Sequence, residues 1–138
     1  MAKTEGDGAT PVGTFALRWV YFRADRQPTP RTRLAATAIT PDMGWCDDPG
    51  HGRYNRLVRR PFAGRHERLW RADALYDLVV VIGHNDTPPR PGDGSAVFMH
   101  IASPAYGPTA GCVALNRRDL VWLLGRIGPE TAIAIEPN

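Results

Sequence analysis

The stretch that decides the fold is Leu78-Val79-Val80-Val81-Ile82, the longest uninterrupted apolar run in the chain. It is long enough for one β-strand, whereas a membrane-spanning helix needs about 20 apolar residues. A continuous apolar run, unlike an alternating one, is typical of a strand that is buried on both faces. We therefore predict a central strand over residues 75–84.

Further strands are predicted on both sides of this run. Residues 14–23 (TFALRWVYFR) are rich in β-branched and aromatic side chains, and residues 95–102 (SAVFMHIA) form a second apolar stretch. Shorter runs predict strands over 112–115 and 131–136. Residues 40–70 show no clean periodicity, so we expect ordered irregular structure there, and a loop of that length often carries function.

One helix is predicted in the C-terminal half. Within residues 117–127, apolar residues recur at the i, i+3, i+4, i+7 spacing of a single helix face. Asn116 is expected to cap its N-terminus, with Asp119 three residues on, and Gly128-Pro129 to end it. The chain is therefore expected to be mainly β with one helix.

Length and composition indicate one globular domain over residues 1–138. Hydrophobic residues make up 43% of the chain and charged residues 22%, which excludes a disordered or fibrous protein. The 14 glycines and 13 prolines favour short strands and ordered loops over a helix bundle. No apolar segment follows the start, so we expect no signal peptide and no transmembrane segment in this chain. We expect a monomer.

A cluster of arginines lies between residues 53 and 71, in a chain whose net charge is +3. Guanidinium groups bind carboxylates and phosphates, so the cluster fits an anionic partner. The alternative is a solvated loop surface. No nucleic-acid-binding motif accompanies the charge, so we expect no nucleic-acid partner.

Two cysteines, Cys46 and Cys112, are too few for a zinc knuckle or a disulfide framework. One disulfide, one reactive thiol or two buried thiols remain open. Asp47 and Asp48 next to Cys46 oppose ionisation of its thiol, so Cys46 is expected to be a packed side chain. The chain has ligand-type residues but no tight ligand spacing, so we expect no metal.

His100 and Cys112 are the candidate catalytic pair. His100 lies at the end of an apolar strand pattern, and Cys112 follows a loop that closes with Thr109-Ala110-Gly111. A thiol is nucleophilic as thiolate, and a neighbouring imidazole makes that form available, so we expect a low pKa for the Cys112 thiol. A turn at Gly111 would let the amides of Gly111 and Cys112 stabilise an oxyanion. From spacing alone, the alternative is an unrelated core cysteine and core histidine.

Three separated segments resemble one known family. They are residues 3–15 (KTEGDGATPVGTF), Met99-His100 and residues 109–115 (TAGCVAL). The L,D-transpeptidase catalytic domain, or YkuD family, has an EGDG-TP-G-F loop, then a histidine on a strand, then a Ser/Thr-x-Gly-Cys turn. The resemblance covers nearly the whole chain. It implies a mixed β-sandwich of the α+β kind, with the opening loop packed near the catalytic end of the sheet.

The resemblance also implies a reaction. By match of motif, Cys112 is the nucleophile, His100 donates and accepts the proton, and the backbone carbonyl of Ile101 orients the imidazole. The expected substrate is a peptidoglycan tetrapeptide stem. The thiolate attacks the carbonyl of its third residue, the acyl group is transferred to the sulfur, and D-alanine leaves. An amine on a second stem then takes the acyl group and forms a 3→3 cross-link. Cysteine acyl transfer needs no cofactor.

Substrate contacts are expected from residues beside the candidate pair, namely His84, Asn85, Thr109 and Ala110. For His84 the alternative is a polar cap on its strand. Many family members carry a histidine where this chain has Ala110, and the interval between His100 and Cys112 is shorter than in many members. These differences concern the choice of acyl acceptor.

The expected substrate lies outside the cytoplasmic membrane, so the periplasm or cell envelope is the expected location. One rival function is an L,D-carboxypeptidase, in which water accepts the acyl group at the same site. Another is a wall-binding module that keeps the fold without turnover. The presence of both His100 and Cys112 argues against that module.

Overall fold

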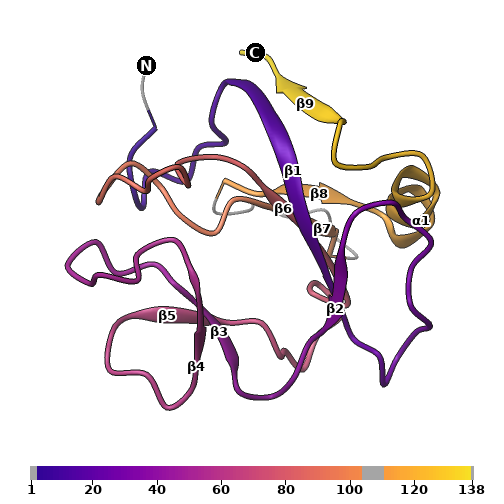
Figure 1. Cartoon of the computed structure of the whole chain (residues 1–138), viewed down its shortest axis with the longest axis horizontal. Coiled ribbons are helices and arrows are strands. Elements are labelled where there is room, and N and C mark those ends of the chain that lie inside the picture. Colours follow the sequence, from indigo (N-terminus) through magenta and orange to yellow (C-terminus); the bar gives the residue numbers. More distant parts are fainter. Residues whose placement is uncertain (1–2, 104–110, 138) are drawn as a thin grey trace.

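The computed structural model describes residues 3–103 and 111–137. In these residues the chain forms two β-sheets and one helix (Figure 1). The elements in chain order are β1 (Gly13–Phe22), β2 (Ala36–Ala38), β3 (Met43–Cys46), β4 (Leu57–Arg59), β5 (His66–Arg68), β6 (Leu78–Ile82), β7 (Phe98–Ile101), β8 (Val113–Leu115), α1 (Arg117–Leu124) and β9 (Ala132–Ile135).

The larger sheet is built around β1 and β6. Its strand order is β2-β1-β6-β7-β8, and β9 pairs with the first residues of β1. β6 runs antiparallel to both β1 and β7, whereas β2 is parallel to β1 and β8 is parallel to β7. The prediction of a mainly β, mixed β-sandwich with one helix in the C-terminal half is confirmed for the described residues.

Every residue of β6 is buried, as the apolar run predicted. Leu78, Val80 and Ile82 point to the face of the sheet that α1 covers and share a core cluster with its leucines. Val79 and Val81 point to the other face and pack with residues of β3. Successive side chains of a strand alternate between faces, so a strand with apolar residues at every position needs a cover on each side.

The smaller sheet, with strand order β4-β3-β5, corrects the expectation of irregular structure over residues 40–70. Its three antiparallel strands are too short for an alternating pattern to stand out: β3 is buried throughout, and β5 reads His-Glu-Arg. The three-residue strand β2 was missed for the same reason. Between the sheets, the ring of Trp45 meets that of Phe98 edge-on, with 5.2 Å between centroids.

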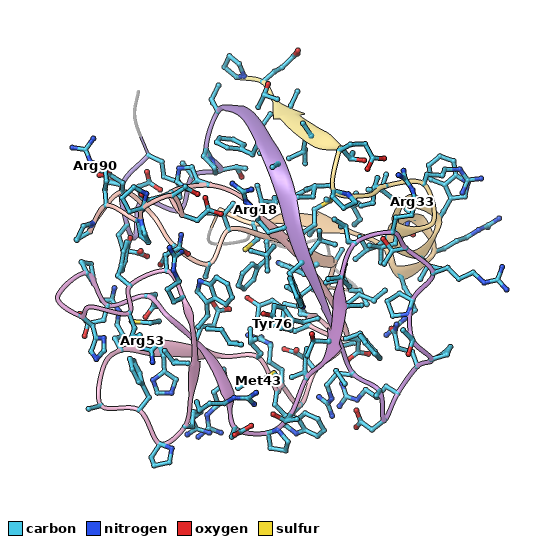
Figure 2. All side chains as sticks on the ribbon, in the orientation of Figure 1. Arg18, Arg33, Met43, Arg53, Tyr76 and Arg90 are labelled. Atoms are coloured by element: carbon cyan, nitrogen blue, oxygen red, sulfur yellow. The ribbon has the colours of Figure 1, made fainter. Side chains whose placement is uncertain are left out.

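Figure 2 shows which side chains lie between the two sheets and which extend into the surroundings. Tyr76 lies in the interior between the two sheets, whereas Arg90 extends from the periphery. Tyr76 packs with Phe98 of β7 in the cluster between the sheets. This inter-sheet layer, rather than the layer under α1, contains the titratable residues considered below.

Helix α1 begins as predicted and ends earlier. The Asn116 side chain caps it, accepting a hydrogen bond of 2.8 Å from the backbone N–H of Asp119. The helix ends at Leu124 rather than at Ile127, because Arg126 N–H bonds to the carbonyl of Leu123 in a tighter turn. Ile127 still reaches the core from that turn.

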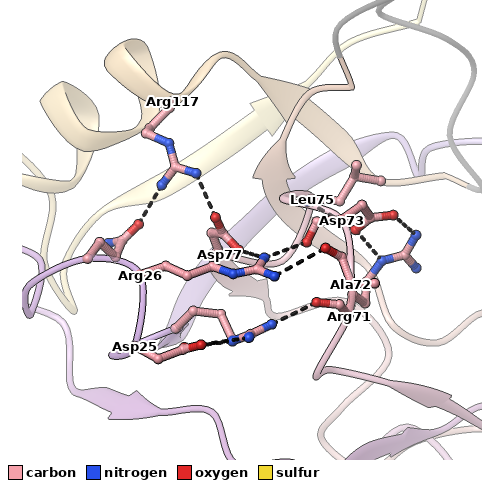
Figure 3. A network of polar contacts seen from close by, with 10 residues as sticks. Asp25, Arg26, Arg71, Ala72, Asp73, Leu75, Asp77 and Arg117 are labelled. Carbon is pink, nitrogen blue, oxygen red and sulfur yellow. Dashed lines mark hydrogen bonds and ion pairs between the residues drawn. The ribbon is translucent and has the colours of Figure 1, made fainter.

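A buried carboxylate ties α1 to the loop before β6 (Figure 3). The side chain of Asp77 is 4% exposed, and its two oxygens lie 2.8 Å from Nη1 of Arg26 and 2.6 Å from Nη2 of Arg117. Arg26 also donates to the carbonyls of Ala72 and Asp73. Arg117 opens α1, where a cation opposes the helix dipole. The ion pair with Asp77 explains why an arginine stands there.

Replacing Asp77 by alanine should lower the free energy of unfolding by about 2–3 kcal/mol, because two guanidinium groups lose their buried partner. Asp93→Ala is the control. Asp93 pairs at 3.6 Å with Arg90, whose side chain is 83% exposed, and such exposed pairs contribute about 0–1 kcal/mol. Urea denaturation measures both. Equal losses in the two variants would contradict the role given to Asp77.

Candidate active site

His100 and Cys112 lie on the same side of the larger sheet. In β7, Met99 and Ile101 pack in the core under α1, so Phe98 and His100 point to the layer between the sheets. Cys112 immediately precedes β8, the parallel neighbour of β7, and packs against that layer as well. Both side chains line one cavity of about 270 Å³.

The imidazole of His100 is held by its own strand. Nδ1 lies 2.9 Å from the carbonyl oxygen of Ile101, the hydrogen bond that family resemblance implied. A carbonyl can only accept, so this bond places the proton on Nδ1 and leaves the lone pair on Nε2. Burial lowers the pKa of His100, which favours the neutral ring. The ring of Tyr76 packs against it at 5.4 Å between centroids.

The Cys112 thiol differs from the sequence expectation. Its Sγ donates to the carbonyl of Ala96 at 3.2 Å. Burial raises the pKa of the thiol to about 11, and the negative charge of Glu67 adds to this, so the expected low pKa is wrong for this structure. A desolvated thiol beside a carboxylate remains protonated at neutral pH.

Cys46 is a packed thiol, as predicted. It is fully buried in β3, and burial, followed by the charges of Asp48 and Asp47, raises its pKa. Cys46 and Cys112, both within the described residues, are not joined by a disulfide, which was one of the alternatives that the sequence left open.

The opening loop packs against the site, as we predicted. Nζ of Lys3 donates to Asp7 at 2.8 Å and to the carbonyl of Ala9 at 2.7 Å, which closes the loop on itself. The backbone N–H of Glu5 donates to the carbonyl of Gly92, and the Glu5 side chain lines the cavity. The sequence analysis identified this loop without assigning a role to Glu5.

Tyr54 and Ser95 hold Glu5 in place. The Tyr54 hydroxyl donates to Oε1 of Glu5 at 2.6 Å, and Ser95 Oγ donates to the same oxygen at 2.5 Å. The Tyr54 oxygen in turn accepts from the backbone N–H of Gly94. Burial, followed by the hydrogen bond to Glu5, raises the pKa of Tyr54 to about 12, so it stays a donor at neutral pH.

Asn55 joins the segments around Cys112 to the smaller sheet. Its Oδ1 accepts from the indole of Trp45 and from the backbone N–H of Ala96, the residue whose carbonyl binds the thiol. Its Nδ2 donates to the carbonyls of His84 and Asn85. The amide therefore uses both donors and both acceptor sites. Sequence reasoning missed Asn55, since nothing local marks a side chain that bonds 29–41 residues away.

Gly111 is required by contact as well as by conformation. Its φ is +99°, and a Cβ built on it would lie 2.6 Å from the carbonyl oxygen of Ala9. The turn before Cys112 therefore touches the opening loop directly, and a side chain at this position would push the two apart.

His84 and Asn85 do not line the cavity that holds His100 and Cys112. The Asn85 side chain bonds to the backbone of Arg90 and Gly94 and so shapes its own loop. The ring of His84 packs edge-on against Phe15 at 5.4 Å, and its buried Nδ1 has no hydrogen-bond partner among the described residues. The other two expected substrate contacts, Thr109 and Ala110, lie outside the described residues.

The arginines between residues 53 and 71 are largely engaged within the protein. Arg65 pairs with Asp47, Arg71 with Asp73 and Arg59 with Asp42. These contacts agree better with a paired surface than with a free anion-binding cluster. Across residues 3–103 and 111–137, no group of three or more His, Cys, Asp or Glu side chains could hold a metal ion.

Comparison with family models matches residues 1–135 to the L,D-transpeptidase catalytic domain, YkuD. The match spans almost the entire chain, so the protein belongs to this family of acyltransferases, which act on peptidoglycan peptides. Comparisons with curated proteins and with solved structures give no match. Of the part of the chain that the structure describes, no helix is long and apolar enough to span a membrane.

Gly111→Ala should destabilise the protein more than Gly6→Ala. Both glycines have positive φ, which costs an L-residue about 1–2 kcal/mol. Only at Gly111 does the new methyl group meet backbone, while Gly6 faces open space, and such overpacking adds about 1–3 kcal/mol. Thermal unfolding gives the comparison, and proteolysis near Gly8 should quicken only in Gly111→Ala. Equal behaviour of the two variants would refute the contact.

The pKa of about 11 predicts how the free enzyme reacts with iodoacetamide. In a Cys46→Ser background, the alkylation rate of Cys112 should keep rising with pH to about 11, because only the thiolate reacts. The fold favours the neutral thiol, so its stabilising contribution is complete below the ordinary thiol pKa near 9 and is lost as pH rises through 11. A rate that levels off near pH 7 would contradict the prediction.

Proposed function

We propose that this protein is a peptidoglycan L,D-transpeptidase that forms 3→3 cross-links with Cys112 as its nucleophile. The observation that carries the proposal is the shared cavity: His100, oriented by the Ile101 carbonyl, and Cys112 line it together in a chain of the L,D-transpeptidase family. The support from the family is for acyl transfer on peptidoglycan peptides. The donor, the bond formed and the nucleophile are parts of the proposal.

Acylation begins with a proton transfer. Nε2 of His100 takes the proton from the Cys112 thiol, and the sulfur attacks the carbonyl carbon of the third residue of a tetrapeptide stem. The oxyanion of the tetrahedral intermediate accepts hydrogen bonds from the backbone amides of Gly111 and Cys112. When the intermediate collapses, the C–N bond breaks and the imidazolium returns its proton to the leaving amine. D-alanine leaves, and a thioester remains.

Deacylation repeats these steps with a new nucleophile. The side-chain amine of a second stem gives a proton to His100 and attacks the thioester, and the thiolate then leaves and is reprotonated. The product is a 3→3 amide. With water in place of the amine, the same steps release a tripeptide and define an L,D-carboxypeptidase, the second candidate. The high thiol pKa supports a mechanism in which His100 removes the proton during attack rather than beforehand.

The proposed substrate also sets a proposed location. Peptidoglycan stems are found outside the cytoplasmic membrane, so we place the activity in the periplasm or cell envelope. The stem peptides are the partners of the reaction, and the chemistry requires no cofactor.

Incubation of the purified protein with disaccharide tetrapeptide, followed by mass spectrometry, tests the proposal. We expect a cross-linked dimer and free D-alanine. Cys112→Ala should abolish both products. His100→Gln should slow the reaction by about 10²–10⁴-fold, the usual contribution of a general base. Cys46→Ser is the matched control and should retain activity, with a stability loss of about 1–2 kcal/mol.

Any result other than a cross-linked dimer would support a different function. Tripeptide without dimer would support the carboxypeptidase, and an unchanged substrate would support a binding module. An active Cys112→Ala variant would overturn the nucleophile and the mechanism together.

A further inference from the structure

Glu67 is a carboxylate in an unusual place. It lies in the middle of β5 directly opposite Trp45 of β3, so both side chains share the face that packs on the larger sheet. The Tyr76 hydroxyl donates to its Oε1, and its side chain lines the cavity of His100 and Cys112. Burial raises the pKa of Glu67, as expected for a carboxyl group at an apolar interface.

Among the described residues no cation forms an ion pair with this carboxylate, although the charge of Arg71 partly offsets the rise of its pKa. The cavity is also lined by Asp47 and Arg71, but Asp47 pairs with Arg65 at 3.2 Å and Arg71 pairs with Asp73 at 2.7 Å. In the described part of the chain, Glu67 has no ion pair. Even partial burial of a carboxylate without an ion pair costs stability, so the presence of Glu67 near a candidate nucleophile points to a role in function.

A structural role does not require the charge. Tyr76 needs only an acceptor for its hydroxyl proton, and the amide oxygen of a glutamine would serve equally. The negative charge also works against the proposed chemistry, because it helps to raise the pKa of Cys112. A cation bound next to Glu67 would offset the cost of burying the carboxylate and would also cancel the charge that raises the pKa of Cys112.

Building on the function proposed above, we propose that Glu67 determines the specificity of this cavity by pairing with a cationic amine on the side chain of the acyl donor. Glu5 of the opening loop, which Tyr54 and Ser95 hold in place, adds negative charge to the same cavity. The ligand class is an acyl donor with a free ammonium group, and a donor whose side chain is neutral is disfavoured.

The pairing also couples substrate binding to the nucleophile. The charged and titratable groups that line the cavity with Cys112 are Glu5, Asp47, Glu67, Arg71, Tyr76 and His100. Lys3, next to Gly111, also acts on the thiol and lowers its pKa, but burial and Glu67 outweigh it. An ammonium next to Glu67 cancels a charge that opposes thiolate formation, and proton removal by His100 becomes easier. The correct donor therefore helps to activate the thiol that it acylates.

The test uses two tetrapeptide donors that differ only at the side-chain amine of the third residue, one free and one N-acetylated. Wild-type protein should be acylated by the free-amine donor with a kcat/KM higher by about tenfold or more than by the acetylated donor, the size expected for a close charge pair. Glu67→Gln should lose about the same factor for the free-amine donor and change little for the acetylated one. Glu130→Gln, at an exposed ion pair with Arg33, is the matched control and should keep the preference.

A loss in Glu67→Gln that is equal for both donors would overturn the proposal and assign Glu67 a structural role through Tyr76. If Glu67→Gln does not fold, the preference of the wild-type protein between the two donors is the test. Equal kcat/KM values for the free-amine and acetylated donors would then overturn the proposal.

A binding measurement separates this inference from the proposed reaction. Calorimetry of Cys112→Ser with each donor reports recognition without turnover. Tighter binding of the free-amine donor by about tenfold, lost in Cys112→Ser/Glu67→Gln, would support the role of Glu67 even if no product formed. Equal binding of both donors, or binding of neither, would overturn it even if the protein proved to be an acyltransferase.

Discussion

The structure depends on the burial of β6 from both sides. Five consecutive apolar residues leave no face of this strand that can meet water, so the sheet requires two covers. Helix α1 provides one, and the short strands of the smaller sheet provide the other. The second cover has a functional consequence, because the cavity with His100 and Cys112 lies in the layer between the two sheets.

Polar residues in that layer have to be held by partners from distant parts of the chain. Asn55 bonds to four groups, Tyr54 and Ser95 fix Glu5, and the Ile101 carbonyl orients His100. Each bond satisfies a group that burial would otherwise leave unpaired. These bonds hold the cavity walls in a defined geometry.

The surroundings of Cys112 favour the protonated, unreactive form of its thiol. Cys112 is desolvated, donates to the Ala96 carbonyl and lies near the carboxylate of Glu67, and all three features stabilise the protonated form. Such a thiol resists adventitious alkylation and oxidation, which act on the thiolate. In the mechanism proposed above, reactivity then depends on His100 and on the charge that a bound ligand brings.

The sequence by itself determined the central strand, its neighbours β1 and β7, and the cap and face of α1, and it singled out His100 and Cys112 as candidates that the structure brings to one cavity. These features rest on periodicity over a few residues or on short motifs, so local order is enough to predict them. The tertiary structure alone decided the three strands within residues 40–70, the partners of Asp77, and the place of Glu67 beside Cys112. It also decided the thiol pKa, since a pKa depends on the burial and charges contributed by every element around the group and not on the adjacent residues.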